Sequence, residues 1–403
     1  MIGIGGAGMS GYARVCEQLG ATVTGSDAND SPKLEQLRRQ NVVVYVGHAA
    51  KNVPKGADVF YSSAIAPSNP ERKAAGKRAQ PRAELLRELS ALKRTIAIAG
   101  AHGKTTTTAM VTHVLTDLEL DPSYLVGGEL LATGENAGWG TGEWLVAEAD
   151  ESDRSMLALN VEIAVILNIE LEHHDKYKSL DELKAVYTEF AENASSQPPI
   201  DRDWPPPRNL ELGPWGSRFK WRNHEVTLPS PGEHNAWNAI AALEACVRAG
   251  VNPAAAAHAM GSFKGVKRRF ERIGMSQARA LVVDDYAHHS TEVAKTIEAA
   301  RTLRPERVVA VFQPHLFSRT EELATEFSSA LGAADQTIVL PIFPAREKQE
   351  DFPGVTSELI AAAHHVQRFS EAQAILARYL RPRDLCLVMG AGDVDELARR
   401  IAQ

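Results

Sequence analysis

The sequence predicts an α/β protein of two or three domains. Short apolar runs alternate with helical patterns along the chain, which predicts parallel sheets. Two glycine-rich loops each follow a predicted strand and precede a predicted helix. At about 150 residues per domain, a chain of 403 residues has room for two or three domains.

The composition excludes several classes of protein. With 44% hydrophobic and 24% charged residues, the chain is not mainly disordered, collagen-like or a coiled coil. A net charge of -7 argues against broad nonspecific binding to nucleic acid, which needs a basic surface. No apolar run reaches the roughly 18 residues of a membrane span. The widely spaced Cys16, Cys246 and Cys386, and an N-terminus without a secretory pattern, predict a cytoplasmic protein.

The first predicted unit begins with a strand end at residues 1–4, a glycine turn and a helix over about 10–19. Further strands are predicted at 21–25, 42–46 and 59–63. A stretch rich in Pro, Lys and Arg, residues 67–82, is expected to lead into the next unit.

The second predicted unit has strands at 95–99, 144–147 and 162–168. Residues 195–217 contain six prolines, which block helix and ladder hydrogen bonds, so a loop or a trimmed region is expected there. A helix follows over 235–249. The third unit, from about residue 273, has strands predicted at 280–284, 307–312, 337–341 and 385–389.

The strongest functional signal is the glycine loop at residues 99–108, directly after a strand and at the start of a helix. Its glycines let backbone N–H groups surround phosphate oxygens, and a helix N-terminus favours negative charge. Lys104 can reach the β- and γ-phosphates, and the hydroxyl of Thr105 can bind Mg²⁺. Ile98 stands where the strict pattern has glycine, and a plain strand-to-helix turn is the alternative. We favour nucleotide binding by Gly100, Ala101, His102, Gly103, Lys104, Thr105 and Thr106.

The N-terminal loop matches Gly-x-Gly-x-x-Gly at Gly3, Gly5 and Gly8. Asp27 follows the next strand, where dinucleotide folds carry an acid that binds ribose. NAD, another diphosphate or no ligand at all are each compatible with this motif. A second nucleotide loop in the same chain favours a substrate that carries a nucleotide diphosphate.

Polar clusters follow several strands. The acidic run 148–153 is well placed to hold magnesium beside the phosphate loop, although a solvated turn is the alternative. Residues 168–175 contain a histidine pair with flanking acids, which could bind metal or be a surface loop. Asp284 and His315 follow strands of the third unit, at the edge where open α/β sheets bind ligands. By contrast, residues 232–238 begin a helix, so His234 or Asn235 could simply cap it.

Taken together, these stretches resemble the Mur ligases of peptidoglycan synthesis, and most of all the branch that adds L-alanine. The resemblance covers nearly the whole chain in matching order. It rests on residues 3–11, 62–65, 81–84, the phosphate loop, 148–153, 168–175, 234–238, 268–270, 284–289, 313–320 and 344–347.

The resemblance implies three domains. These are a Rossmann-like UDP-sugar-binding domain at 1–88, a central P-loop ATPase-like domain at 89–271, shortened near 195–225, and a Rossmann-like amino-acid-binding domain at 272–403. It also implies that the lactyl carboxylate of UDP-N-acetylmuramate attacks the γ-phosphate of ATP, and that the amine of L-alanine attacks the resulting acyl phosphate. ATP and Mg²⁺ are the implied cofactors. No nucleic-acid or membrane partner is expected, and we expect a monomer or weak homodimer.

The same resemblance implies roles for individual residues. The implied catalytic residues are Lys104, Glu148, His173, His315 and Arg319. The implied metal ligands are Thr105, Glu148 and His173. Besides the phosphate loop, ATP is expected to contact Asn235, Arg269 and Asp284. The implied substrate-binding residues are Gly5, Gly6, Gly8, Met9, Ser10, Asp27, Ser63, His288, Arg319 and Arg346.

This sequence departs from the family pattern in a few places. Ala101 stands where threonine is common, and Leu171, Glu172 and His174 replace the usual Pro, Asp and Met. No lysine is a clear candidate for the carbamylated lysine of related branches.

Three other functions stay open at this stage. A recycling ligase would attach a whole tripeptide to the same UDP-sugar, but residues 148–153 and 313–320 argue against it. A dinucleotide-dependent dehydrogenase is disfavoured by the second phosphate loop. A noncatalytic nucleotide-binding relic is disfavoured because Lys104, Glu148, His173 and Arg319 are all present.

Overall fold

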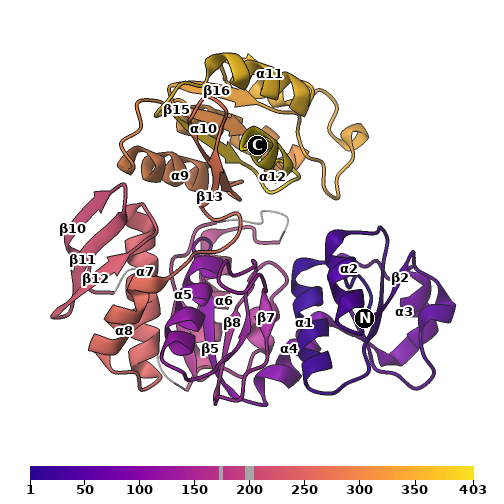
Figure 1. The fold of residues 1–403 in the computed structure, drawn as a ribbon. Coiled ribbons are helices and arrows are strands. Elements are labelled where there is room, and N and C mark those ends of the chain that lie inside the picture. Colours follow the sequence, from indigo (N-terminus) through magenta and orange to yellow (C-terminus); the bar gives the residue numbers. More distant parts are fainter. Residues whose placement is uncertain (172–175, 196–203) are drawn as a thin grey trace. The chain divides into compact units, whose positions relative to one another are not determined.

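The predicted α/β class is confirmed by a computed structural model, which describes residues 1–171, 176–195 and 204–403 (Figure 1). The chain groups into two compact units. The first comprises Met1–Pro206 and Asn238–Met260, and the second comprises Pro207–Trp237 and Gly261–Gln403. Helix α7 (Glu233–Arg248) contains the point at which the chain passes from the second unit back into the first.

The first unit contains α/β elements throughout. Its other helices are α1 (Ala7–Gln18), α2 (Pro32–Arg39), α3 (Pro70–Ala75), α4 (Arg82–Ser90), α5 (Lys104–Asp117), α6 (Leu180–Glu192) and α8 (Pro253–Ala259). Its strands are β1 (Thr24–Asp27), β2 (Val43–Val46), β3 (Val59–Tyr61), β4 (Ala79–Pro81), β5 (Arg94–Ala99), β6 (Ser123–Leu125), β7 (Ala137–Gly138), β8 (Trp144–Glu148) and β9 (Ile163–Ile166).

The N-terminal part of this unit is built from short parallel pairings. β1 pairs with β2, and β3 pairs with β4. The strand expected at residues 1–4 is reduced to Ile2, which bridges both Ser26 and Tyr61. Because α1 already begins at Ala7, the first glycine loop is short and runs directly into a helix.

The main sheet of the first unit has the order β7-β6-β8-β5-β9 and is parallel except for β7. Both β8 and β9 are hydrogen-bonded to β5, so the three predicted strands of this unit are neighbours. Ile98 pairs with Glu148, which puts the end of β8 level with the loop that follows β5. The register therefore brings the predicted acidic cluster beside the predicted phosphate loop.

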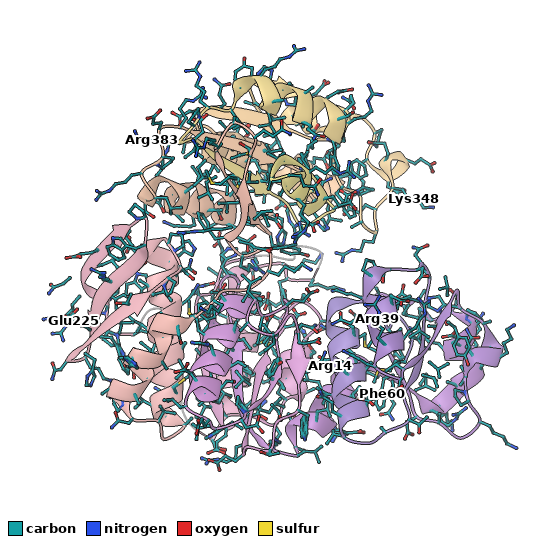
Figure 2. All side chains as sticks on the ribbon, viewed as in Figure 1. Arg14, Arg39, Phe60, Glu225, Lys348 and Arg383 are labelled. Atoms are coloured by element: carbon teal, nitrogen blue, oxygen red, sulfur yellow. The ribbon has the colours of Figure 1, made fainter. Side chains whose placement is uncertain are left out.

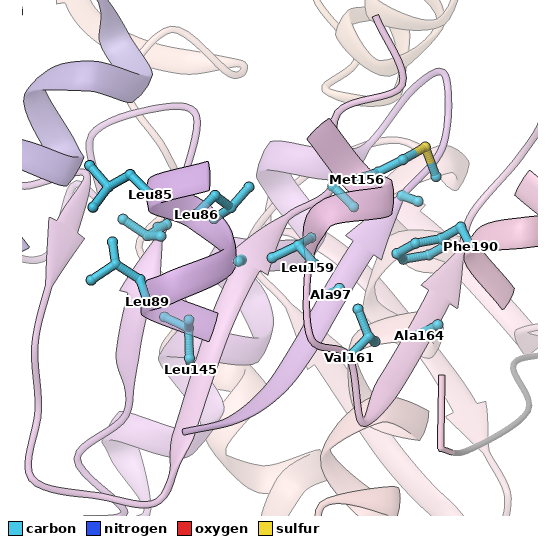
Figure 3. Packing of buried hydrophobic residues seen from close by; sticks show 14 of the residues in the cluster. Leu85, Leu86, Leu89, Ala97, Leu145, Met156, Leu159, Val161, Ala164 and Phe190 are labelled. Atoms are coloured by element: carbon cyan, nitrogen blue, oxygen red, sulfur yellow. The ribbon is translucent and has the colours of Figure 1, made fainter. Parts of the chain in front are cut away.

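One buried apolar cluster holds this sheet to helices α4 and α6 (Figure 3). Leu85 and Leu89 of α4, Leu145 of β8, and Phe190 of α6 belong to one buried cluster. Full burial of one such side chain contributes about 1.5–3 kcal/mol. Consecutive residues of β5, β8 and β9 are buried, so both faces of these strands are covered, which explains their continuous apolar sequences.

The second unit contains a six-stranded sheet of order β13-β14-β18-β15-β16-β17. Its strands are β13 (Glu271–Met275), β14 (Leu281–Asp285), β15 (Val308–Phe312), β16 (Gln336–Val339), β17 (His364–His365) and β18 (Leu385–Met389). Its helices are α9 (Ser290–Thr302), α10 (Phe317–Leu331), α11 (Phe369–Tyr379) and α12 (Asp395–Ile401). Short 3₁₀ helices of the chain lie at Ala50–Asn52, Gly76–Arg78, Ser155–Ala158, Met260–Ser262, Gln349–Asp351 and Ser357–Leu359. All four strands predicted for this unit are present, and within the described six-stranded sheet β13 pairs antiparallel while the other strands pair parallel.

The prediction of a loop over residues 195–217 was wrong for the second half of that range. Strands β10 (Arg208–Gly213), β11 (Gly216–Trp221) and β12 (His224–Leu228) form an antiparallel three-stranded sheet. The dense prolines end at Pro207, and Pro214 lies in the turn between β10 and β11, so none of the described prolines of this stretch interrupts a ladder. Pro198 and Pro199 lie outside the described residues.

Charged side chains such as Arg39, Glu225, Lys348 and Arg383 are exposed at the surface (Figure 2). Within the described parts of the chain, no helix combines the length and apolar character needed to cross a membrane.

Candidate functional site

The predicted phosphate loop connects β5 to α5 in the first unit. Gly100 has φ +142° and Gly103 has φ +85°, a left-handed conformation at the position that precedes the helix. A Cβ atom on Gly103 would lie 2.5 Å from Oδ1 of Asn238. Gly103 is therefore required both by its backbone angle and by the close approach of Asn238. The arrangement of strand, glycine loop and helix N-terminus is that of an anion-binding loop.

Asn168, at the end of β9, fixes the shape of this loop. Its side chain exchanges two hydrogen bonds with His102, and its carbonyl oxygen accepts from the N–H of Ala101 at 3.2 Å. His102 also contacts Glu170, with 3.0 Å between Nε2 and Oε2. Asn168 begins the stretch 168–175, in which a histidine pair was predicted to bind metal, and no role was predicted for Asn168 itself.

Lys104, the first residue of α5, contacts both the loop and the acidic cluster. Its Nζ donates to the carbonyl oxygen of Gly100 at 2.5 Å and to that of Ala101 at 3.3 Å. It also donates to the two carboxylate oxygens of Glu151, at 3.2 and 3.1 Å. Glu151 belongs to the predicted acidic run, although it had not been singled out.

The acidic run begins at the end of β8. Oε1 of Glu148 accepts from the N–H of Gly127 at 2.5 Å. Asp150 and Asp153 both pair with Arg82, at 2.8 and 2.7 Å. Burial of Asp150 favours its neutral form, but the charges of Lys104 and Arg82 and hydrogen bonds from Ser152 outweigh burial and lower its pKa to about 2. This edge of the sheet therefore carries fixed negative charge at neutral pH.

Two of the three predicted metal ligands are described. Thr105 lies buried in the first turn of α5, and Glu148 ends the strand next to β5. A hydroxyl and a carboxylate are the hard oxygen donors that Mg²⁺ prefers, so these residues fit that ion. His173, the third predicted ligand, lies outside the described residues, as do Glu172 and His174.

A cavity of about 210 Å³ links the first glycine loop to the acidic strand end. Its lining includes Gly8, Gly11, Tyr12, Arg82, Glu148 and Asp150. A Cβ atom on Gly8 would lie 3.1 Å from Nη1 of Arg82, so the glycine lets the guanidinium approach the loop. Burial raises the pKa of Tyr12 to about 12, which keeps this phenol neutral.

The other residues predicted for the UDP-sugar surround the same loop. Oδ2 of Asp27 accepts from the N–H of Gly5 at 2.8 Å, and Gly6 precedes α1. Met9 and Ser10 are buried in the first turns of α1. Ser63 is exposed, and its neighbour Ser62 packs against Gly3.

In the second unit, three of the predicted residues lie together at the carboxyl ends of β14 and β15. The rings of His288 and His315 have centroids 6.0 Å apart, and Nη1 of Arg319 lies 3.4 Å from Nδ1 of His315. His315 also stacks on Phe343, with centroids 5.7 Å apart. Burial, assisted by the charge of Arg319, lowers the pKa of His288 to about 3 and that of His315 to about 4. Both imidazoles are therefore neutral at pH 7. Arg346 is exposed, and its charge also lowers the pKa of His315.

The three remaining predicted nucleotide contacts also belong to the second unit. Asp284 is fully buried, and its Oδ2 lies 3.4 Å from Nε of Arg268. Burial raises the pKa of Asp284 to about 7, against the opposing charge of Arg268. The guanidinium of Arg269 lies 5.2 Å from the centre of the Tyr286 ring. Asn235, in the first turn of α7, donates from Nδ2 to the carbonyl oxygen of Pro231 at 2.8 Å.

Comparison with known proteins gives three consecutive matches to family models. Residues 1–94 match the Mur ligase family catalytic domain, 98–200 the Mur ligase middle domain, and 268–392 the Mur ligase glutamate ligase domain. The UDP-N-acetylmuramate–L-alanine ligase of Streptomyces avermitilis is 42% identical over 446 residues, with 99% of this chain and 96% of the relative covered. The chain belongs to the Mur ligase family. The resemblance inferred from the sequence is thus confirmed.

Other proteins similar to this Mur ligase also support its place in the family. The enzyme of the same name from Rubrobacter xylanophilus is 40% identical, with 100% of this chain and 98% of the relative covered. Among solved structures, the UDP-N-acetylmuramate-alanine ligase of Thermotoga maritima matches with a TM-score of 0.84 and 26% identity, over 99% of this chain and 97% of that one. A murein peptide ligase from Psychrobacter arcticus shares the fold, with a TM-score of 0.72 and 22% identity over 99% and 97% of the two chains. The three-domain Mur ligase architecture is therefore established, whereas the predicted domain boundaries and residue roles stay predictions.

Proposed function

We propose that this Mur ligase joins L-alanine to the lactyl carboxylate of UDP-N-acetylmuramate and converts ATP to ADP and phosphate. The observation that carries the proposal is the cavity in the first unit. It is lined by the first glycine loop on one side and by Glu148 and Asp150 on the other, next to the phosphate loop. Relatives 38–42% identical over nearly the whole chain bear the name of this ligase, which supports the same substrates here.

ATP binds at the loop between β5 and α5. Transfer of its γ-phosphate requires positioning and neutralisation of negative charge rather than a covalent enzyme group. Backbone N–H groups of residues 100–105 and the N-terminus of α5 hold the phosphates, and Lys104 supplies a positive charge. Thr105 and Glu148, with His173 as the third predicted ligand, would hold Mg²⁺, which would offset the negative charge of the phosphates.

UDP-N-acetylmuramate binds across the first glycine loop. The diphosphate lies against Gly5, Gly6 and Gly8, where the absence of side chains allows close approach. Met9, Ser10, Asp27 and Ser63 surround the nucleotide half. The cavity beyond Gly8 directs the lactyl carboxylate towards Glu148 and the phosphate loop. There the carboxylate attacks the γ-phosphate, the bond to the β,γ-bridging oxygen breaks, ADP leaves and the acyl phosphate forms.

L-Alanine binds in the second unit. The guanidinium of Arg319 holds the substrate carboxylate through two parallel hydrogen bonds, and this orients the amine. His315 and His288 are neutral at pH 7, so these two rings add no positive charge beside the ammonium group of alanine. The exposed Arg346 adds positive charge that favours an anionic substrate. Asn235, Arg269 and Asp284 of this unit stay the other residues predicted to contact ATP.

The ligase acts in the cytoplasm, in the synthesis of the peptidoglycan precursor on which cell shape and division depend. It works on small molecules as a monomer or weak homodimer, without a nucleic-acid or membrane partner.

The proposal is tested by phosphate release from ATP with Mg²⁺, UDP-N-acetylmuramate and each standard amino acid in turn. We expect release that depends on both the UDP-sugar and L-alanine. The tripeptide L-alanyl-γ-D-glutamyl-meso-diaminopimelate is assayed in parallel, and faster release with the tripeptide than with L-alanine would favour the recycling ligase. Release that needs neither substrate would contradict both.

A further inference from the structure

The phosphate-loop lysine is paired with an acidic residue outside the predicted metal site. Nζ of Lys104 lies 3.2 and 3.1 Å from Oε1 and Oε2 of Glu151, and the same nitrogen donates to the carbonyl oxygens of Gly100 and Ala101. An ammonium group has only three hydrogens to donate. To reach a phosphate oxygen, Lys104 must therefore give up part of these contacts.

Glu151 is held firmly in place. Its side chain is only 3% exposed, whereas that of Lys104 is 17% exposed. Its carbonyl oxygen accepts from the hydroxyl of Tyr177 at 2.5 Å and from the N–H of Arg154 at 3.2 Å. A carboxylate buried to this degree is costly unless a cation compensates it, and Lys104 supplies that cation.

We propose that Glu151 is a positioning residue for phosphoryl transfer, which keeps Lys104 against its loop until the phosphates of ATP replace the carboxylate as its partner. This inference rests on the proposed function, because the competing anion is the triphosphate of ATP. A carboxylate and a phosphate oxygen compete for the same ammonium group, so part of the binding energy of ATP is used to open the ion pair. Glu151 acts through Lys104 and touches no substrate.

The test is calorimetric titration of Mg-ATP into the enzyme in the absence of UDP-sugar and alanine, where no turnover occurs. Glu151→Gln keeps the size of the side chain and an acceptor oxygen but removes its charge. We expect Kd for Mg-ATP to fall by about threefold to tenfold, the range of one charge-assisted hydrogen bond offset by the remaining neutral one. The matched control, Glu162→Gln, removes a carboxylate that pairs with Arg94 at the opposite end of the sheet, and Kd should not change.

A double-mutant cycle shows whether Glu151 changes the Kd for Mg-ATP through Lys104. In a Lys104→Ala background, Glu151→Gln should no longer tighten Mg-ATP binding, because the lysine through which it acts is missing. An equal gain in that background would show that Glu151 merely repels the nucleotide, and it would overturn the inference.

An unchanged or raised Kd in Glu151→Gln, with an unchanged melting temperature, would also overturn the inference. Should Glu151→Gln fail to fold, Glu151→Asp keeps the charge on a shorter side chain that cannot hold Lys104 as closely. Kd should then fall by a smaller factor, and a value equal to that of the wild type would contradict the proposal. Failure of the proposed function is seen separately, as a wild-type enzyme without alanine-dependent phosphate release.

Discussion

Asn168 and His102 exchange a reciprocal pair of hydrogen bonds across the edge of the main sheet. The backbone N–H of His102 donates to Oδ1 of Asn168 at 2.9 Å, and Nδ2 of Asn168 donates to the carbonyl oxygen of His102 at 3.0 Å. One side chain at the end of β9 thus satisfies both backbone groups of a residue in the middle of the phosphate loop.

Asn168→Ala should weaken nucleotide binding, because the loop loses both bonds and the backbone groups of His102 lose their partner. Each buried polar group left without a partner costs about 1–3 kcal/mol. We expect KM for ATP to rise about tenfold or more, with a lower melting temperature. Asn160→Ala, at an exposed position before β9, is the control and should change neither quantity.

Lys104→Ala should abolish ligase activity while the fold is retained. Loss of a charge that stabilises the transferring phosphoryl group typically costs at least 100-fold in rate. Phosphate release measures the activity, and circular dichroism shows whether the fold is retained. The control is Lys184→Ala on the exposed face of α6, and normal turnover by Lys104→Ala would refute the role given to the loop.

Gly103→Ala should impair ATP binding more than backbone strain alone explains. A non-glycine residue at φ +85° costs about 1–2 kcal/mol, and the added Cβ would also lie 2.5 Å from Oδ1 of Asn238. Gly134→Ala is a matched control, since Gly134 has φ +74° but nothing within 4 Å of the added atom. Thermal melts and ATP titration should show a larger loss for Gly103→Ala. Equal losses in the two variants would argue against a tightly fitted loop.

Arg319→Lys should raise KM for L-alanine by about tenfold or more and leave the KM values for ATP and the UDP-sugar nearly unchanged. Lysine provides a point charge and cannot bind a carboxylate through two parallel bonds. Arg378→Lys, on the exposed side of α11, controls for the loss of a guanidinium. Steady-state kinetics with each substrate varied separately shows which KM value rises. A rise confined to ATP would move Arg319 to the nucleotide site.

Asp284→Asn should stabilise the protein increasingly as the pH rises. Burial raises the pKa of Asp284 to about 7, from an ordinary value of 3.8. Between these values the folded protein keeps a proton that the unfolded chain has released, so Asp284 costs stability as the pH rises through this range. The melting temperature of the variant should therefore exceed that of the wild type by a few degrees more at pH 8.5 than at pH 5. A difference that is the same at both pH values would contradict the raised pKa.

The sequence predicts the main strands well, because parallel strands buried on both faces leave continuous apolar runs such as those of β5 and β18. The sequence did not predict β10 to β12, because its prolines argued against strands in this region. Those prolines lie just before β10 and in the turn between β10 and β11. Short strands such as β7 depend on their partners rather than on their own sequence.

The candidate site could be predicted only in part. The phosphate loop and the acidic run were visible because their chemistry lies in consecutive residues. The roles of Asn168, Glu151 and Arg82 were not, since each depends on a contact with a segment more than 40 residues away in the chain. Such contacts are set by the register of neighbouring strands, which a single sequence does not reveal.

This chain activates the lactyl carboxylate with ATP and then joins it to L-alanine, as we propose above. The most direct measurement uses UDP-N-acetylmuramate labelled with ¹⁸O in the lactyl carboxylate, together with Mg-ATP and L-alanine, followed by mass spectrometry of both products. We predict that the alanyl UDP-sugar forms and that the released phosphate carries one ¹⁸O atom from the carboxylate. Phosphate without label, or phosphate released without any alanyl product, would contradict the account.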